Sequence, residues 1–269
     1  MFNKPLVVLL LILAAFVYSA PTVTADSPAP AILDLQYIGK GIIKVKYQPP
    51  ANVKAIVRIT KDKSSYDYSL TAGSSYPLQL GNGSYTVMVA EAASANKYKV
   101  IHKETVELKL ADANIVFRQT SPIVNWNTNN LAVLKAQQLN KNAKTDQDKI
   151  KSIYAHITKT FKYDNTKAAS VKPDYLPNLD AVFKSGKGIC YDYAATFAAM
   201  ARSIGLTTKL VVGYENKHPD VLHAWNEVYL EESGEWVTID TTYDAAKVQA
   251  GQAPPLFKSA NSYTMTKFY

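Results

Sequence analysis

The hydrophobic pattern of this 269-residue chain changes its period near residue 125, and this change narrows the choice of folds most strongly. Before that point, apolar and polar residues alternate in short segments, which are separated by turn signals such as Gly81-Asn82-Gly83. Alternation with period two is typical of strands that bury one face. The segments with this pattern are 42–47, 55–59, 84–89 and 105–110. We therefore expect an all-β sandwich domain over residues 32–112.

Beyond residue 125 the apolar residues recur at the three- and four-residue steps of helices. Thr145 can cap a helix whose buried stripe contains Ile150, Ile153 and Ile157. Residues 164–179 contain two prolines and predict a surface loop. Strand-like segments return at 208–214, 223–230 and 235–240, with a loop around His218 between the first two. This part of the chain therefore combines helices with strands.

The N-terminus has the pattern of an export signal. Lys4 precedes an uncharged apolar run over residues 6–20, which is too short to span a bilayer comfortably. We predict a signal peptide over residues 1–25 and a proline-rich linker over residues 26–31. A retained N-terminal anchor is the alternative. The expected localisation is secreted or extracellular, and association with the cell surface stays open.

The charge of the chain excludes no class of partner by itself, but its distribution argues against nucleic acid. The formal net charge is +8, from 30 basic and 22 acidic side chains, and no run of one sign stands out. We therefore expect a solvated basic surface and no nucleic-acid partner. Weak attraction to an anionic cell wall or membrane face stays open.

The single cysteine, Cys190, cannot form an internal disulfide. It is therefore either a small buried hydrophobe or a residue used for its reactivity. Gly186 and Gly188 precede it, and an alanine-rich run that ends at Gly205 follows it, which predicts a helix that begins near Cys190. The positive end of a helix dipole favours a thiolate over a thiol, and this makes a cysteine nucleophilic.

His223 and Asp240 flank a predicted hairpin in the same part of the chain. If residues 231–234 form a four-residue loop, Leu230 faces Glu235, and Asp240 lies diagonal to His223 on the same face. A three-residue loop would reverse this facing. With the first register, Asp240 can orient one ring nitrogen of His223 while the other meets Cys190. That arrangement suffices for acyl transfer through a thioester.

Three blocks of residues, in order and approximate spacing, resemble the core of bacterial transglutaminases. They are Gly188–Ala194, His223–Tyr229 and Trp236–Asp240, with Gly213-Tyr214 between the first two. The resemblance covers residues 125–245 and implies a papain-like α+β fold in a transglutaminase-like catalytic domain over residues 120–269, including a C-terminal tail. It assigns the nucleophile to Cys190, the general base to His223 and the orienting acid to Asp240.

Two details of the resemblance stay open. The family's side chain that completes the oxyanion hole lies upstream of the cysteine, and here Tyr154 and Tyr163 are the candidates. The family often has proline after its aspartate, whereas this chain has Thr241, which leaves the local turn undefined.

The expected activity is acyl transfer or hydrolysis on protein amide or peptide bonds, with a protein or peptide as substrate. Crosslinking, deamidation and proteolysis share the thioester, so the residues do not choose among them. We expect no cofactor and no metal site, since no calcium loop of the EF-hand type is present, although calcium dependence stays open. The alternative is a catalytically silent extracellular binding or scaffold protein with the same fold.

Overall fold

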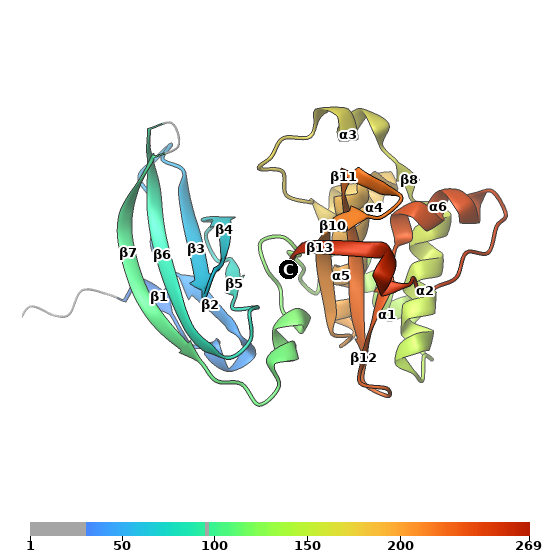
Figure 1. Cartoon of the computed structure of the whole chain (residues 1–269), viewed down its shortest axis with the longest axis horizontal. Coiled ribbons are helices and arrows are strands. Elements are labelled where there is room, and N and C mark those ends of the chain that lie inside the picture. Colours follow the sequence, from blue (N-terminus) through green and yellow to red (C-terminus); the bar gives the residue numbers. More distant parts are fainter. Residues whose placement is uncertain (1–30, 95–96) are drawn as a thin grey trace, which may run out of the picture. The chain divides into compact units, whose positions relative to one another are not determined.

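A computed structural model describes residues 31–94 and 97–269 of the chain (Figure 1). The predicted signal peptide over residues 1–25 lies outside the described residues, as does the predicted linker except for Ala31. Among the described helices, none combines the length and the apolar composition needed to cross a bilayer.

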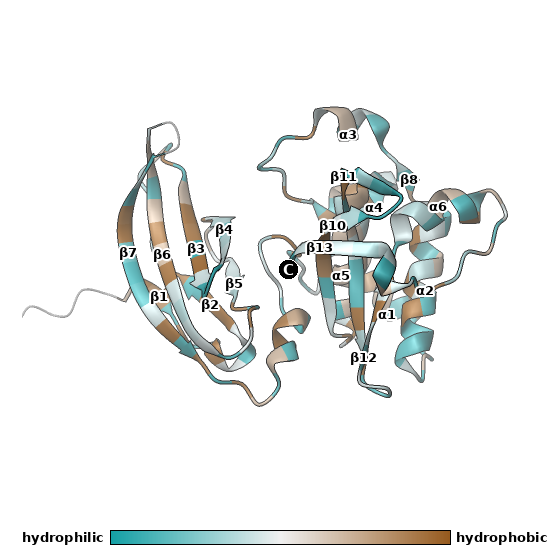
Figure 2. Cartoon of the chain, in the orientation of Figure 1, coloured by the Kyte–Doolittle hydropathy of each residue, from teal (hydrophilic) through white to brown (hydrophobic). Residues whose placement is uncertain are grey.

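The N-terminal part of the described chain contains two antiparallel sheets. One has the strand order β4-β3-β6-β7, and the other has the order β1-β2-β5. Their strands are β1 (Leu33–Asp34), β2 (Ile42–Val45), β3 (Ala55–Lys61), β4 (Ser64–Ser69), β5 (Ser75–Pro77), β6 (Gly83–Ser94) and β7 (Lys97–Leu108). Apolar and polar residues alternate along β3 and β6, as Figure 2 shows, and the inward set is buried.

All four predicted strands of this part are present, and three further strands, β1, β4 and β5, were missed. Strand β4 has the sequence Ser-Ser-Tyr-Asp-Tyr-Ser, so tyrosines are the only large side chains that it buries. A polar strand of this kind carries little apolar alternation, and its pairing with β3 therefore comes from the neighbouring strand rather than from its own pattern.

The C-terminal part has a four-stranded antiparallel sheet with the order β12-β11-β10-β13. Helix α5 packs against β10 and β11 (Figure 1), and almost all of its side chains are buried. The strands of this part are β8 (Lys162–Tyr163), β9 (Lys187–Gly188), β10 (Thr208–Glu215), β11 (His218–Leu230), β12 (Glu235–Ile239) and β13 (Tyr263–Phe268). The mixture of helices and sheets confirms the α+β class.

The C-terminal part also contains α-helices, some of a few residues and others of several turns. They are α1 (Leu131–Leu139), α2 (Asp146–Thr160), α3 (Asn165–Ser170), α4 (Leu179–Ser185), α5 (Cys190–Ser203) and α6 (Thr241–Gln249), with the 3-10 turns η1 (Ile38–Lys40), η2 (Ala113–Arg118) and η3 (Ala260–Ser262) elsewhere in the described chain. The cap predicted for α2 is confirmed, because the Thr145 hydroxyl accepts a hydrogen bond from the Asp148 amide at 3.1 Å.

Two predicted loops were partly wrong. The predicted loop over residues 164–179 begins with helix α3, because the Asp164 side chain accepts a hydrogen bond from the Lys167 amide and caps that short helix. The predicted loop around His218 is shorter than expected. Strand β11 begins at His218, since residues 218–222 extend the hairpin with β10.

The predicted register of the β11–β12 hairpin is confirmed. Leu230 pairs with Glu235, and Asn226 pairs with Ile239 at the other end of β12. The next residue, Asp240, is the N-cap of α6, where its Oδ1 atom accepts hydrogen bonds from the amides of Thr242 and Tyr243, both at 3.1 Å. A helix start therefore occupies the place at which the related sequences often have proline.

Candidate active site

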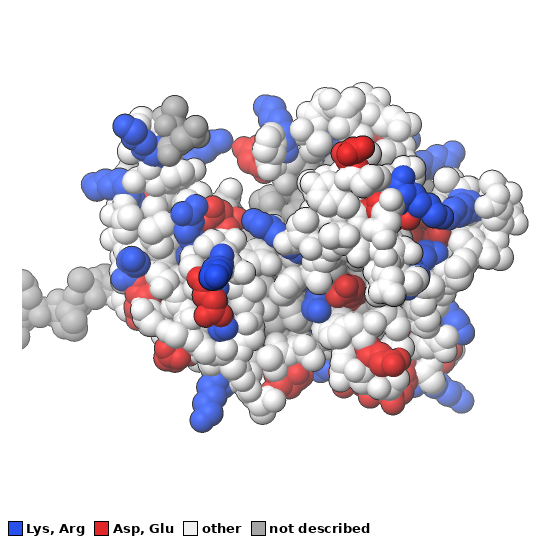
Figure 3. Space-filling view, viewed as in Figure 1, with Lys and Arg blue, Asp and Glu red and all other residues white. Residues whose placement is uncertain are grey.

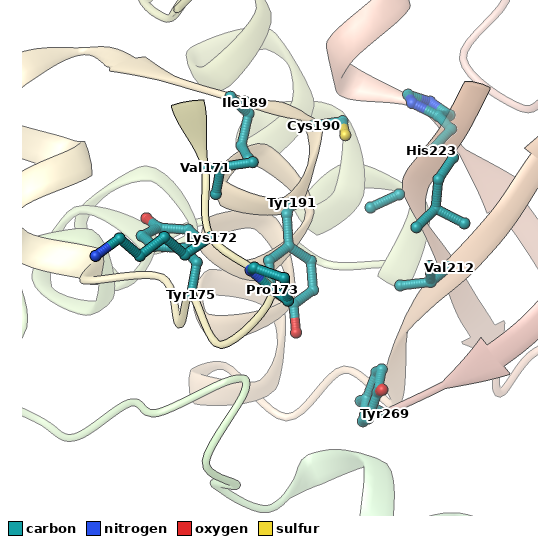
Figure 4. Close-up of a pocket in the computed structure, with 12 residues that line it drawn as sticks. Val171, Lys172, Pro173, Tyr175, Ile189, Cys190, Tyr191, Val212, His223 and Tyr269 are labelled. Carbon is teal, nitrogen blue, oxygen red and sulfur yellow. The ribbon is translucent and has the colours of Figure 1, made fainter. Parts of the chain in front are cut away.

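Cys190 is the first residue of α5 and lines a cavity of about 470 Å³ (Figure 4). The helix start is held by Asp192, whose Oδ2 atom accepts a hydrogen bond from the Ile189 amide at 2.9 Å. Gly188 makes this contact possible, because a Cβ atom there would lie 2.6 Å from the Cβ atom of Asp192. The thiol is half-buried and faces the cavity, so a substrate can reach it.

His223 lies in β11 and connects Cys190 with Asp240. The Nε2 atom of His223 is 2.8 Å from the Oδ2 atom of Asp240. An ionised carboxylate only accepts hydrogen bonds, so Nε2 is the donor and Nδ1 is left for the thiol. His223 and Cys190 line the same cavity, and the nearby Cys190 contributes to the raised pKa of the imidazole. The structure therefore brings together the three side chains that the sequence singled out.

The electrostatics of this group favour a charged imidazole. Burial disfavours the charge and by itself lowers the pKa of His223. The hydrogen bond with Asp240 and the electrostatic influence of Asp240 and Cys190 outweigh burial and raise that pKa to about 9. Below pH 9 the ring therefore carries a proton that it can give to a leaving group.

Asp240 is fully buried and accepts hydrogen bonds at both oxygen atoms. Besides the two amides of α6 on Oδ1, its Oδ2 atom accepts from His223 and from the Tyr263 hydroxyl at 3.1 Å. Four donors around one carboxylate fix its orientation. Tyr263 is on strand β13, and no sequence pattern connected it with Asp240.

Aromatic side chains enclose the imidazole. The ring of Tyr243 stacks on His223 with centroids 4.2 Å apart and planes at 14°. Trp225 lies on the same strand as His223, is buried, and packs against Tyr263 at 4.9 Å. Because both rings restrict the imidazole, His223 is held in the orientation that faces Cys190.

Asn226 connects the sheet to α5, and Gly213 allows two strands of the sheet to approach each other closely. Asn226 is fully buried, and its Nδ2 atom donates to the Ala194 carbonyl in α5 at 3.0 Å. Gly213 lets β13 approach β10, because a Cβ atom there would lie 2.1 Å from the Thr264 carbonyl and 2.9 Å from Trp225. A larger residue than glycine would therefore move β13, and Tyr263 with it.

The two oxyanion candidates occupy different places. The Tyr154 hydroxyl donates to Asp244 at 2.8 Å, and this bond fixes it behind the site. Tyr163 is paired with Gly188 between the short parallel strands β8 and β9, and burial together with the nearby Cys190 raises the pKa of its hydroxyl. The geometry therefore favours Tyr163.

A second buried carboxylate lies beside the thiol. Asp192 has no exposed surface and accepts hydrogen bonds from the Lys167 ammonium at 2.6 Å and from the Tyr175 hydroxyl. Lys167 also contacts the Tyr175 hydroxyl at 2.5 Å. These contacts attach the segment from α3 to Tyr175 to the start of α5. Nothing in the sequence pattern indicated them.

Within residues 31–94 and 97–269, no group of three or more His, Cys, Asp or Glu side chains has the arrangement of a metal site.

Basic and acidic side chains are interspersed on the face of the molecule in Figure 3. The expectation of no nucleic-acid partner stays a prediction.

Residues 135–241 match the family model of the transglutaminase-like superfamily. Over 78 residues the chain is 31% identical to a protein-glutamine gamma-glutamyltransferase of Pseudomonas aeruginosa, covering 25% of this chain and 12% of that protein. Over 68 residues it is 31% identical to a peptide-N(4)-(N-acetyl-beta-glucosaminyl)asparagine amidase of Yarrowia lipolytica. This match covers 25% of this chain and 17% of that protein. The chain thus spans less than a fifth of the length of either relative.

Two solved structures are also similar. One is described as a TGase, with 25% identity, a TM-score of 0.32, and coverage of 41% of this chain and 29% of that chain. The other is a candidate cysteine protease from Cytophaga hutchinsonii, with 14% identity and a TM-score of 0.45. That similarity covers 81% of this chain and 82% of that chain. The family match covers the segment that contains Cys190, His223 and Asp240, so residues 135–241 are similar to transglutaminase-like domains.

Proposed function

We propose that this chain is an exported thiol enzyme that transfers acyl groups from protein amides through a thioester on Cys190. The observation that carries the proposal is the position of His223, which bonds Asp240 with one ring nitrogen and interacts with Cys190 on the wall of an open cavity. Export rests on the predicted signal peptide over residues 1–25.

In the first step the sulfur of Cys190 attacks the carbonyl carbon of a carboxamide. The oxygen of the tetrahedral intermediate lies at the start of α5, where the Cys190 amide and the Tyr163 hydroxyl are available as donors. The C–N bond then breaks, and the imidazolium of His223 gives its proton to the leaving amine. A thioester remains on Cys190.

In the second step water or a primary amine attacks the thioester. His223, now neutral, accepts the proton of the nucleophile at Nδ1, and the thiolate of Cys190 leaves. Asp240 stays ionised and stabilises the imidazolium that forms. Water gives hydrolysis or deamidation, and an amine gives a crosslink, so access of the second substrate decides the product.

The direct test uses casein as the glutamine donor and the fluorescent primary amine dansylcadaverine, with products identified by mass spectrometry. Incorporated amine indicates transamidation, a one-dalton gain indicates deamidation, and chain cleavage indicates proteolysis. Cys190→Ala should abolish all three. Absence of all three products, with and without calcium, would contradict the proposal and favour a catalytically silent binding protein.

A thiol-specific reagent gives an independent test, because the chain has one cysteine. We expect iodoacetamide to alkylate Cys190 of the folded protein at pH 6, and we expect His223→Ala to slow that reaction. A thiol that reacts only after denaturation would contradict the nucleophilic role.

A further inference from the structure

The cavity beside Cys190 is mostly apolar. Figure 4 shows Val171, Pro173 and Tyr175 on one side of it and Val212 on the opposite side, with Tyr269 at the end far from the thiol. Its volume of about 470 Å³ is within the range of roughly 300–1,000 Å³ that is usual for ligand pockets. Lys172 and His223 are the charged or titratable side chains that line it besides Cys190 and the tyrosines.

Cys190 lines this cavity itself, so the atoms next to a reacting carbonyl must enter it. On this basis, which rests on the proposed function, we propose that the cavity is a specificity pocket for a large apolar or aromatic side chain adjacent to the reacting amide of a polypeptide substrate. Burial of such a side chain against these walls would stabilise the bound substrate. Among the described residues, no acidic side chain lines this cavity, so a basic side chain would find no counter-charge there.

Two elements build the opposite walls. One wall is the segment that Asp192 fixes through Lys167 and Tyr175. Because Asp192 also holds the Ile189 amide at the start of α5, the wall and the thiol share one anchor. Asp192 therefore fixes the position of this pocket wall relative to the thiol of Cys190.

The other wall includes the hairpin between β10 and β11, where Leu222 lines the cavity although it is 58% exposed. Its neighbour Val221 is 56% exposed and does not line the cavity. The two residues have similar exposure but only Leu222 lines the cavity, so Val221 is a matched control for a change at Leu222.

The experiment measures kcat/KM for two series of glutamine peptides, in which Gly, Leu, Phe or Lys stands directly before or directly after the glutamine. In one of the series we expect Leu and Phe peptides to react about tenfold faster than the Gly peptide, with Lys no faster than Gly. Leu222→Ser should reduce the preference at least threefold, whereas Val221→Ser should leave it unchanged. Equal rates for all peptides would overturn the pocket while leaving the proposed function intact.

A second readout needs no turnover. The alkylation rate of Cys190 is compared for iodoacetamide and N-benzyl-iodoacetamide, which both form a C–S bond and release iodide. We expect the benzyl reagent to react several-fold faster relative to each reagent's rate with free cysteine, and we expect Leu222→Ser, but not Val221→Ser, to remove that advantage. If no peptide is turned over, the proposed function fails, and this ratio alone decides the pocket. Equal normalised rates, or equal effects of the two substitutions, would overturn it.

Discussion

Two buried carboxylates, Asp240 and Asp192, lie on either side of the thiol and have similar surroundings. Each is fully buried, and each accepts hydrogen bonds from a tyrosine hydroxyl, from backbone amide and from one side chain that can carry positive charge. For Asp240 that side chain is His223, and for Asp192 it is Lys167.

The difference between the two groups is the chemistry of the cationic partner. An imidazole exchanges its proton near the pH at which proteins work, whereas an ammonium keeps its charge there. The group of Asp240 can therefore move a proton beside the thiol, and the group of Asp192 can only hold a position. A buried carboxylate that accepts a hydrogen bond from a tyrosine thus holds its neighbours in place. The cationic side chain bound to the carboxylate determines whether the group also takes part in a reaction.

The sharpest test of this difference is Asp240→Asn. The amide oxygen can still accept the two hydrogen bonds at the start of α6, so the fold should persist. The amide nitrogen cannot accept a hydrogen from Nε2 of His223, and we expect kcat to fall about 10³- to 10⁴-fold. Steady-state kinetics with matched circular dichroism spectra would check this, and the exposed Asp220→Asn on the same strand is the control. A loss below tenfold would contradict the role of Asp240.

The corresponding change, Asp192→Asn, should act on stability. It leaves the Lys167 ammonium, which is 25% exposed, without its counter-charge. We expect the free energy of unfolding to fall by about 2 kcal/mol in urea titrations. Asp67→Asn, which breaks an exposed ion pair with Arg58, should cost less than about 1 kcal/mol. Equal losses for the two variants would refute the anchoring role.

The pH dependence separates proton transfer from nucleophilicity. His223 has a raised pKa of about 9, so the proton-donating form dominates below that value and disappears above it. We expect acylation to slow about tenfold for each pH unit above 9. Alkylation of Cys190 by iodoacetamide needs no proton donor and should not slow over the same range. A parallel fall of both rates would contradict the assignment to His223, because raising the pH does not remove the thiolate.

The two tyrosines give the smallest and most selective comparison. Tyr263→Phe removes a hydrogen bond to Asp240, and we expect kcat to fall about fivefold with little change in KM. Tyr175→Phe removes a hydrogen bond to Asp192 in the pocket wall, and we expect KM to rise about fivefold with kcat kept. The reverse pattern would show that the two anchors have been assigned to the wrong steps.

Local features of the sequence predicted much of this site. The glycines before Cys190 and the alanines after it indicated the start of α5, and the four-residue loop fixed the register that brings Asp240 toward His223. Such signals are readable because a helix cap or a hairpin loop involves residues only a few positions apart.

Other parts of the site depend on contacts between distant segments. Tyr263 reaches Asp240 because β13 pairs with β10 through a bulge at Gly213, and no periodic pattern encodes that pairing. The contact of Lys167 with Asp192 likewise joins residues 25 positions apart.

The sequence alone thus determined which side chains meet at the proposed site and which secondary structure presents them. The tertiary structure decided what surrounds them, namely the ring that stacks on His223, the carboxylate that fixes the pocket wall and the apolar cavity itself. The physical reason is that backbone hydrogen bonding and hydrophobic period act over a few residues, whereas a cavity exists only where elements from several parts of the chain meet.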